Sequence, residues 1–414
     1  MSPGLDRAAL DALIARPRLQ RVLAALDAPG EETRLVGGAV RDALLGRRVA
    51  DVDLATTLLP DEVVRRVAEA GLKPVPTGIS HGTVTVVAEG EPFEVTTLRE
   101  DIETDGRHAV VRFGRDFARD AERRDFTINA LSADPAGGLH DTVGGIPDLA
   151  AGRVRFIGAA AQRIREDYLR VLRFFRFHAR YGRGAMDPEG LAASIAAREG
   201  LGLLSRERVR GELLKLLVAP RAAEVAAILS GTGLLQRLIG GIGDLGRLGR
   251  LCGREDAPDA VRRLGALAVL APPDADRLRE GLRLSKAEHA RLAAYADAAA
   301  SLHGAPAPLD VAAIRRQVAR FGVQAVSDAV LVLAGEPTPV LTDPAARALA
   351  AFTAGDAQAP AFPLTGAGLV SRGIRPGPGL GRALAAARAA WLAEGCPEDA
   401  AARERLAAIA LATA

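Results

Sequence analysis

Residues 35–56 read LVGGAVRDALLGRRVADVDLAT, and this stretch decides the fold of the N-terminal part of the chain. The apolar run before Gly37 predicts a strand, the segment after Gly38 predicts a helix, and VADVDLAT at residues 49–56 predicts a second strand. A strand that runs through two glycines into a helix leaves amides that can face an anion, with no Cβ to block its approach. The turn therefore predicts a phosphate-binding site.

Two carboxylates follow this turn in the second predicted strand. Asp51 and Asp53 are two residues apart, so both side chains are expected on one face of the strand. Such a pair repels itself unless a cation lies between the groups, and Mg²⁺ takes oxygen ligands together with substrate phosphates. A bare pair is also typical of a solvated strand end. Glu94 favours the metal site, because it is expected on a neighbouring strand and three carboxylates can hold two metal ions for displacement at phosphorus.

The rest of the N-terminal part alternates short strands with helices. Residues 1–30 predict one helix, and residues 61–70 predict another. TVTVVA at 83–88 and FEVTTL at 93–98 predict a hairpin, because four turn-prone residues, EGEP, separate two β-branched runs. After GGLHDTVGGIPDL at 137–149, apolar residues recur at helical spacing almost to the end of the chain.

The predicted fold class is α+β: a small α/β head with a mixed sheet and flanking helices, followed by a long all-helical neck, body and tail. Segments rich in glycine and proline divide the chain. The predicted domains are the head at 1–150, the neck at 151–225, the body at 226–340 and the tail at 341–414.

Composition limits the class of protein. The chain has 414 residues, of which 49% are hydrophobic and 25% charged, the balance of a soluble globular protein. It contains no apolar run of about eighteen residues, so neither a membrane span nor a signal peptide is expected. Its two cysteines, Cys252 and Cys396, cannot build a disulfide framework or a thiolate metal site, and they predict the reducing cytoplasm.

Basic charge gathers in one segment. The whole chain carries a net charge of +3, but residues 145–215 hold 14 basic and 8 acidic side chains, a local excess of six. This segment predicts a polyanionic partner such as nucleic acid, although arginine-rich helices are also a matter of composition. Six of the aromatic residues lie within residues 156–181. Stacking on bases is one interpretation, and Phe174 and Phe177, three residues apart, favour a helix core instead.

Four motifs occur in order along the predicted head. They are GGAVRDALLG at 37–46, DVDLAT at 51–56, FEVTTLREDIETDGRHAVV at 93–111 and RRDFTINAL at 123–131. Together they resemble the catalytic head of the class II tRNA nucleotidyltransferases, a family that comprises the CCA-adding enzymes and the related bacterial poly(A) polymerases. The resemblance covers about residues 33–215, and it reaches the tail only through FPLTGAGL followed by PGPGLG.

The resemblance implies a role for each matching residue. Asp51 and Asp53 would hold two catalytic Mg²⁺ ions, and Glu94 would be the third acidic residue, which helps to activate the 3′-hydroxyl of the RNA. Two further groups would bind the nucleotide. Gly37, Gly38 and Arg41 match the segment that contacts the triphosphate, and Arg124, Asp125 and Asn129 match the motif that holds ribose and phosphates.

EDYLRVLRFFRF at 166–177 is a second informative segment. Glu166, Asp167 and Arg170 match the family's EDxxR, in which protein side chains take the place of a nucleic-acid template. Asp167 and Arg170 are predicted on one helical face. There the carboxylate can accept from the amino group of cytosine or adenine, while the guanidinium donates to the adjacent ring nitrogen. Glu166 can brace Arg170, and a plain surface ion pair is the alternative.

Three other segments bear on the substrate. LLSRERVRGELLKLL at 203–217 resembles the family's next motif, with Ser205 expected as a helix N-cap. Residues 99–122 resemble the flexible loop of complete CCA-adding enzymes, which favours addition of all three nucleotides. Gly368 stands where relatives often have an acidic residue, so the tail's contact with RNA stays open.

The implied function is the addition of CMP, CMP and AMP from CTP and ATP to the 3′ end of tRNA, without a nucleic-acid template and with release of pyrophosphate. The implied partners are tRNA and the two nucleotides, and no membrane; the oligomeric state stays open. The alternatives are a poly(A) polymerase of the same family and an enzyme that adds only CC or only A. A non-catalytic RNA-binding protein is the alternative from a different class, and the presence of all three carboxylates argues against it.

Overall fold

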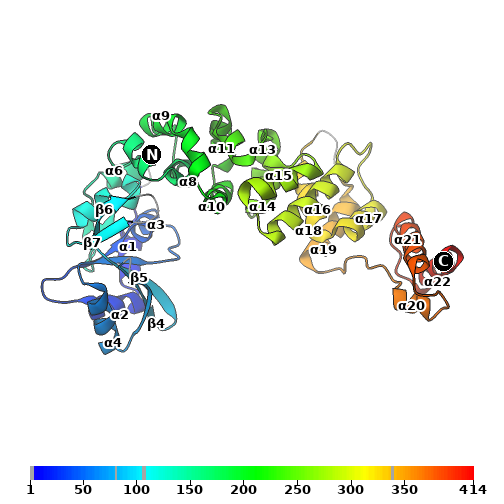
Figure 1. Cartoon of the computed structure of the whole chain (residues 1–414), viewed down its shortest axis with the longest axis horizontal. Coiled ribbons are helices and arrows are strands. Elements are labelled where there is room, and N and C mark those ends of the chain that lie inside the picture. The colour runs from blue at the N-terminus through cyan, green and yellow to red at the C-terminus, as the bar shows by residue number, and fades with distance from the viewer. Residues whose placement is uncertain (1–3, 80–81, 105–108, 337–339) are drawn as a thin grey trace. The chain divides into compact units, whose positions relative to one another are not determined.

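The computed structural model describes residues 4–79, 82–104, 109–336 and 340–414. The chain divides into two compact units, Met1–Leu204 and Ser205–Ala414. Figure 1 shows the order of the elements, with the strands in the first unit and helices throughout the second. The predicted α+β class is confirmed. The finer division into head, neck, body and tail stays a prediction.

A seven-stranded mixed sheet forms the centre of the first unit, in the order β3-β4-β5-β2-β1-β8-β9. Strands β2 and β5 pair in parallel, and the other neighbours pair antiparallel. The strands are β1 (Thr33–Val36), β2 (Asp53–Thr56), β3 (Lys73–Gly78), β4 (Thr83–Ala88), β5 (Glu91–Thr97), β8 (Ser132–Ala133) and β9 (Leu139–His140). In β4 every second residue is buried, as expected for a strand with one face on a core.

Helices cover this sheet and continue the first unit beyond it. Helices α2 and α4 pack on β4 (Figure 1). The helices are α1 (Arg7–Ile14), α2 (Pro17–Leu26), α3 (Gly38–Leu44), α4 (Pro60–Glu69), α5 (Phe117–Glu122), α6 (Gly145–Ala151), α7 (Ala160–Glu166), α8 (Leu169–Tyr181) and α9 (Pro188–Ala196), with 3₁₀ turns at Thr127–Asn129 and Arg198–Leu203. Among the described residues no strand follows β9, in agreement with the loss of β pattern in the sequence.

The single helix predicted for residues 1–30 is wrong. Two helices, α1 and α2, occupy this segment, and the break falls at Arg16, which is extended with φ −58° and ψ 127°. Pro17 is the cause, because its ring disfavours helical backbone at the residue before it and it lacks an N–H group. As the first residue of α2, Pro17 loses nothing, since that N–H would have no partner.

The predicted hairpin is confirmed with a shorter turn. Ala88 pairs with Glu91, so the turn contains Glu89 and Gly90 alone, with φ values of 50° and 83°. Two residues in left-handed backbone match the twist of the flanking strands. The segment predicted as a loop at 99–122 instead contains a second, two-stranded sheet of β6 (Arg99–Thr104) and β7 (Ala109–Phe113), followed by α5. Residues 105–108 of that segment lie outside the described residues.

The aromatic residues after residue 155 form a core, so the packing interpretation is confirmed. The ring centroids of Phe126 and Phe156 lie 4.9 Å apart, and those of Phe156 and Phe174 lie 5.3 Å apart. Phe177 packs on Phe126 at 5.1 Å. Phe174 is fully buried, which leaves no ring face open to a base. This cluster attaches α8 to the RRDFTINAL segment.

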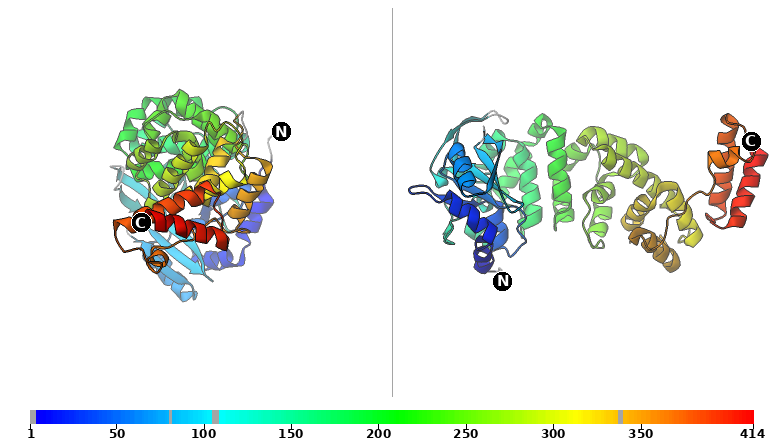
Figure 2. Two further views of the ribbon diagram at one scale, coloured as in Figure 1. Left: turned by 90° about the vertical axis from the view of Figure 1, so that its right-hand side faces the viewer. Right: turned by 90° about the horizontal axis from the view of Figure 1, so that it is seen from below.

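The second unit is built from helices. They are α10 (Arg206–Leu217), α11 (Ala222–Gly231), α12 (Leu234–Ile239), α13 (Leu245–Cys252), α14 (Ala260–Ala268), α15 (Pro272–Leu282), α16 (Lys286–Leu302), α17 (Val311–Phe321), α18 (Val323–Leu333), α19 (Asp343–Ala354), α20 (Gly366–Val370), α21 (Pro378–Ala393) and α22 (Ala400–Thr413). Figure 2 shows α21 and α22 side by side, where Trp391 is buried with Cys396 and Leu406. Of the described helices, none has the length and apolar character to cross a membrane.

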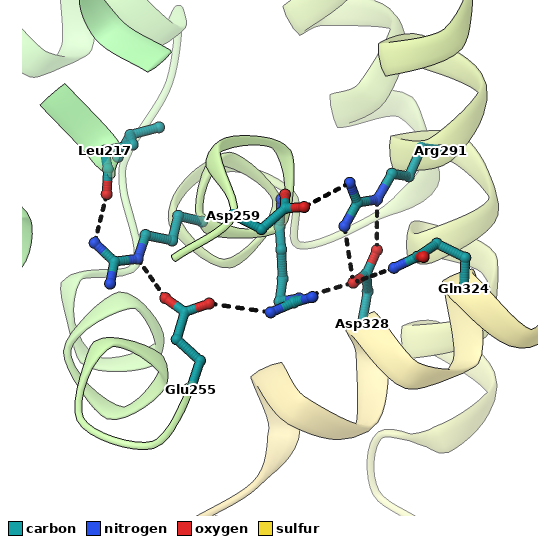
Figure 3. Close-up of polar contacts among 8 residues, drawn as sticks. Leu217, Glu255, Asp259, Arg291, Gln324 and Asp328 are labelled. Carbon is teal, nitrogen blue, oxygen red and sulfur yellow. Dashed lines mark hydrogen bonds and ion pairs between the residues drawn. The ribbon is translucent and has the colours of Figure 1, made fainter. Parts of the chain in front are cut away.

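A buried ionic network joins helices α14, α16 and α18 of the second unit and the loop that follows α13 (Figure 3). The Asp328 carboxylate of α18 accepts from Arg291 of α16 at 2.8 Å and from Arg262 of α14 at 2.8 Å. Glu255, just after α13, accepts from Arg262 at 3.1 Å and also from Arg263. The side chains of Asp328 and Glu255 are each 1% exposed. Since burial of a charge is costly unless it is paired, this network is possible only because every carboxylate has a guanidinium partner.

Candidate active site

The three predicted carboxylates gather at the start of β2 and on the adjacent strand. Asp53 begins β2 and lies opposite Glu94 of β5 in the parallel register. Asp51 lies before β2 rather than within it, so the prediction of both aspartates in one strand is wrong. Both aspartates are nevertheless exposed while Val52 and Leu54 are buried, so the alternation expected from the sequence continues through Asp51.

The raised pKa of Asp53 indicates that positive charge does not balance the carboxylates at this edge of the sheet. Its side chain is partly exposed, yet the surrounding protein removes water, and this desolvation raises the pKa of the carboxyl. The negative charges of Glu94 and Asp51 raise the pKa further, and Arg124 opposes them. Within the described part of the chain, no ion pair neutralises any of the three carboxylates. Their oxygens are the ligands that hard divalent cations take, so the residues fit Mg²⁺ chemically.

The three groups do not form a closed ligand set as they stand. Over the described ranges, no three acidic, histidine or cysteine side chains come close enough together to hold a metal ion. Like charges at this edge repel one another, and a cation bound between them would offset that repulsion. The predicted roles of Asp51, Asp53 and Glu94 therefore rest on register and charge, and they stay proposals.

The glycine turn lies against Arg124. Gly37 separates β1 from α3 with φ 64°, and a Cβ built on it would lie 2.8 Å from the Nη1 atom of Arg124. Any side chain at residue 37 would thus displace this guanidinium as well as strain the backbone. The Gly37 amide, however, donates to the carbonyl of Leu131 at 2.9 Å. This one amide is therefore not available to an anion, and the predicted phosphate site at the turn stays a prediction.

Asp120 holds Arg124 in place, and the sequence analysis missed it. The Asp120 carboxylate of α5 accepts from Arg124 at 3.1 Å and also pairs with Arg123. Burial acts to raise the pKa of Asp120, but Arg124 and Arg123 outweigh it, so the pKa lies below its usual value. The signal was present in the sequence as an acidic residue three and four positions before two arginines.

Arg41, Asn129 and Asp125 form a buried chain of bonds beneath the turn. Arg41 donates to the Asn129 side-chain carbonyl through Nη1. The Asn129 amide donates to Asp125 Oδ1 at 2.9 Å, and Asp125 Oδ2 accepts from Arg173 of α8 at 2.6 Å. Each of the three predicted residues is less than 9% exposed. Arg173 is a second residue that the sequence analysis missed, since no local pattern pairs it with a residue 48 positions away.

The EDxxR segment is not one continuous helix. Helix α7 ends at Glu166, and Asp167 is extended with φ −154° before α8 begins at Leu169. The prediction that Asp167 and Arg170 share a helical face is wrong, because the backbone of Asp167 is extended, with ψ 108°, and lies outside both helices. Its carboxylate accepts from the Leu169 amide at 3.0 Å, next to the N-cap of α8, Tyr168. The predicted brace is confirmed: Arg170 donates to Glu166 at 2.6 Å across the break. Glu166 also pairs with Arg163 at 3.1 Å.

Two positions that the sequence analysis singled out beyond the head, Ser205 and Gly368, lie near the starts of helices. Ser205 is the N-cap of α10 as predicted, but its side chain makes no capping bond. Gly368 lies in α20, where its amide donates to the Thr365 hydroxyl at 3.1 Å. A Cβ at residue 368 would lie 3.2 Å from that hydroxyl, so the residue is close to its N-cap and has little room for a larger side chain.

Comparison with known proteins finds matches to two segments of the chain. The sequence pattern of the Poly A polymerase head domain matches residues 33–155, and that of the probable RNA and SrmB-binding site of polymerase A matches residues 185–242. The chain is 46% identical over 208 residues to the mitochondrial CCA tRNA nucleotidyltransferase 1 of Danio rerio, covering 50% of this chain and 48% of that protein. It is 42% identical over 222 residues to the CCA-adding enzyme of Geobacillus thermodenitrificans, covering 53% and 54%. The match thus spans about half the length of these curated relatives.

Solved structures extend the likeness over the whole chain. The CCA-adding enzyme of Bacillus stearothermophilus, crystallised with CTP, matches with a TM-score of 0.74 and 27% identity, covering 96% of this chain and 98% of that one. The Thermotoga maritima CCA-adding enzyme complexed with tRNA matches with a TM-score of 0.66 at 20% identity over 100% and 99% of the two chains, which shows a shared fold. On its ordered head motifs, its mixed sheet and these relatives, residues 33–155 form a Poly A polymerase head domain, and the whole chain shares the fold of a CCA-adding enzyme.

Proposed function

We propose that the chain is a CCA-adding enzyme, which transfers CMP, CMP and AMP from CTP and ATP to the 3′ end of tRNA and releases pyrophosphate at each step. The observation that carries this proposal is the parallel register of Asp53 and Glu94, with Asp51 close enough to raise the Asp53 pKa. Relatives at 42–46% identity bear the names of such enzymes. In each step the 3′-oxygen forms a bond to the α-phosphorus while the bond from that phosphorus to the pyrophosphate oxygen breaks.

Members of this family use divalent metal ions, and we propose two Mg²⁺ ions held by Asp51 and Asp53. When bound, such ions stabilise the charge that develops on the attacking and leaving oxygens. Glu94 lies opposite Asp53, where it can accept a hydrogen bond from the 3′-hydroxyl and orient it. The raised pKa of Asp53 supports this assignment, because a nearby cation is what would keep that carboxyl ionised.

The nucleotide is proposed to lie between the glycine turn and α8. Gly37 and Gly38 leave room for the triphosphate, and Arg124 lies at the turn, where its positive charge acts to lower the pKa of Asp53. The chain of bonds formed by Arg41, Asn129 and Asp125 is proposed to hold the ribose and phosphates of the nucleotide. The triphosphate is therefore proposed to bind the guanidinium of Arg124 rather than the Gly37 amide, which already donates to the Leu131 carbonyl.

Asp167 and Arg170 are proposed to select the base, with Glu166 as the brace. Replacing Asp167 by alanine removes the acceptor for the amino group of cytosine or adenine, and replacing Arg170 by alanine removes the donor to the ring nitrogen. We expect UTP and GTP to gain on CTP and ATP by one to two orders of magnitude, since a lost pairing of this kind is worth about 1–3 kcal/mol. Relative kcat/KM values for the four nucleotides measure the change.

The matched control for this prediction is Arg65→Ala. Arg65 donates to Glu69 four residues away on α4, as Arg170 donates to Glu166, but its side chain is 52% exposed. Its loss should leave all four kcat/KM ratios unchanged. Equal ratios in wild type, Asp167→Ala and Arg170→Ala would refute the amino-acid template in this protein.

Product length distinguishes the proposed function from its rivals. With a tRNA that ends at the discriminator base, CTP, ATP and MgCl₂, we expect products that stop three nucleotides longer, and two nucleotides longer when ATP is left out. The match to the Poly A polymerase head domain favours one second candidate. A poly(A) polymerase would instead produce a long tail from ATP alone. An enzyme that adds only CC or only A stops after two nucleotides or requires a tRNA ending in CC, and a non-catalytic RNA-binding protein leaves the tRNA unchanged.

Domain roles and location complete the proposal. The head at 1–150 is proposed to hold the chemistry, the neck at 151–225 to select the nucleotide, and the body at 226–340 and tail at 341–414 to support and bind tRNA. Both cysteines are free, and we propose the cytoplasm as a reducing compartment. The zebrafish relative carries a mitochondrial name, so imaging of the tagged protein decides between the two compartments.

A further inference from the structure

Tyr181, the last residue of α8, contacts Arg41 and Arg47, two arginines that precede Asp51 in the sequence. Its hydroxyl accepts from Arg41 Nη2 at 2.7 Å and from Arg180 Nε at 2.9 Å. Its single proton is then directed to the Asp42 carboxylate, 3.4 Å away. The guanidinium carbons of Arg41 and Arg47 lie 4.1 Å and 4.8 Å from its ring centroid. One side chain thus contacts α3 through Arg41 and, through Arg47, the segment that leads from α3 toward Asp51.

The Tyr181 hydroxyl completes the bonding of a buried cation. Arg41 is 6% exposed, and its other nitrogens donate to Asp42 at 3.0 Å and to Asn129. A buried guanidinium that lacks one partner pays the full loss of hydration for that group. No other described acceptor is within hydrogen-bond distance of the Nη2 atom. The position of Arg41 therefore depends on the hydroxyl of Tyr181.

Arg47 bonds the end of α8 to the segment just before Asp51. It lies four residues before Asp51 and donates to the Arg180 carbonyl at 3.2 Å through both terminal nitrogens. The end of α8 is thereby bonded to the loop that leads into β2. A shift of this end would move the loop, and Asp51 lies at its far side.

A second tie holds α8 nearer its start. Arg173 donates to Asp125 at 2.6 Å, eight residues before Tyr181, which corresponds to about 12 Å along a helix. Two attachment points at that spacing fix the direction of a helix, whereas one would leave it free to pivot. Arg170 lies in the first turn of α8, so its place relative to the carboxylates is set by both ties.

We propose that Tyr181 is a positioning residue, which holds α8 and the loop before Asp51 in one arrangement and so sets where Arg170 presents its guanidinium to the incoming nucleotide. The inference rests on the proposed function and deepens it, because it assigns to this hydroxyl part of the accuracy of base selection. Tyr181 touches neither the reacting atoms nor the base in this account. It acts through Arg41, Arg47 and the direction of α8.

The test is Tyr181→Phe, which keeps the ring and removes the hydroxyl. We expect kcat for CTP and ATP to fall about 10-fold and the preference for CTP over UTP to fall about 3–10-fold, because displacement of a positioned group by about 1 Å costs up to 100-fold. The affinity for tRNA should remain unchanged. Hydrogen exchange of the α8 amides should become faster, while that of α4 stays as in wild type.

The matched control is Thr97→Val. Thr97 is 1% exposed, and its hydroxyl donates to the Leu58 carbonyl at 2.7 Å, so this change also removes one buried hydroxyl from the first unit without touching α8. Its melting temperature should fall, and its nucleotide preference should not. A Tyr181→Phe variant that loses melting temperature but keeps the wild-type preference overturns the proposal.

Different results would overturn the proposed function and the positioning role of Tyr181. A wild-type chain that adds no nucleotide to tRNA overturns the proposed function, whatever the variants do. Hydrogen exchange needs no substrate, so unchanged exchange of α8 in Tyr181→Phe overturns the positioning role on its own. Faster exchange of α8 together with a lower CTP preference supports it.

Discussion

Replacing Asp53 by alanine abolishes nucleotide addition and leaves tRNA affinity nearly intact: this is the largest effect that we expect. Asp53 lies opposite Glu94 at the edge proposed for the metal ions, and a lost metal ligand removes several kcal/mol of transition-state stabilisation, or more than about a hundred-fold in rate. The basic side chains within residues 145–215, which are proposed to bind RNA phosphates, are untouched by the change. Rates of CMP addition and tRNA dissociation constants for wild type, Asp51→Ala and Asp53→Ala measure both quantities.

The control for this prediction is Asp61→Ala, an exposed aspartate in the first turn of α4, which should retain full activity. If both Asp51→Ala and Asp53→Ala kept more than a few per cent of the rate, the metal assignment would be wrong. An unchanged rate in one variant alone would assign the metal ions to the other aspartate and Glu94.

Asp53→Asn should stabilise the folded protein. This change can be measured by unfolding, without any measurement of activity. The pKa of Asp53 is raised in the folded protein by desolvation and by Glu94 and Asp51, so the ionised carboxyl destabilises the fold at neutral pH. We expect Asp53→Asn to raise the free energy of unfolding at pH 7 by about 0.2–1 kcal/mol, as for adjacent like charges on strands. The gain should disappear at low pH, where Asp53 is protonated in both the folded and the unfolded chain. Equal stabilisation of both proteins by MgCl₂ would contradict the assignment.

The second large effect is on folding: Asp328→Ala should lower the free energy of unfolding by about 3–5 kcal/mol, as when one partner of a buried ion pair is removed. Asp328 accepts from Arg262, Arg291 and Gln324 and is 1% exposed (Figure 3). Its loss leaves two guanidinium groups, those of Arg262 and Arg291, with unmet donors directed into the space where the buried carboxylate lay. Urea unfolding of the full chain, followed by circular dichroism, measures the change.

Asp276→Ala is the matched control, because Asp276 pairs with His289 at 2.8 Å in the same unit but is 70% exposed. An exposed pair of this kind contributes about 0–1 kcal/mol. Equal losses in Asp328→Ala and Asp276→Ala would show that the network of Figure 3 does not stabilise the unit. Asp328→Asn, which keeps the shape and loses the charge, should fall between them.

Acid should weaken the same network. Burial acts to raise the pKa of Asp259, but bonds from the Arg262 amide and the Arg291 guanidinium outweigh it, so its pKa lies below the usual value. A carboxyl with a lowered folded pKa stabilises the protein above its unfolded pKa of about 3.9. That contribution is lost as the pH falls through the folded value.

The sequence by itself determined the elements whose cause is local. The strand, glycine turn and helix around Gly37, the hairpin of β4 and β5, and the helical remainder all follow from periodicity and turn residues within a few positions. Bracing of Arg170 by Glu166 was equally local, since it needs four residues of separation and it survived the break at Asp167. The errors of this kind, at Pro17 and at Asp167, occurred where one residue ended a helix that the apolar pattern continued.

Only the tertiary structure decided which distant side chains meet. Arg41 and Tyr181 are 140 positions apart, and Arg262 and Asp328 are 66 apart. Their pairing depends on how helices pack, because a periodic pattern says which face of a helix is buried and not which neighbour covers it. A charged side chain on a mostly buried face is energetically acceptable only once that packing has supplied its partner. For this reason the sequence pointed to the carboxylates of the proposed reaction, while the contacts that position them became visible in the folded chain.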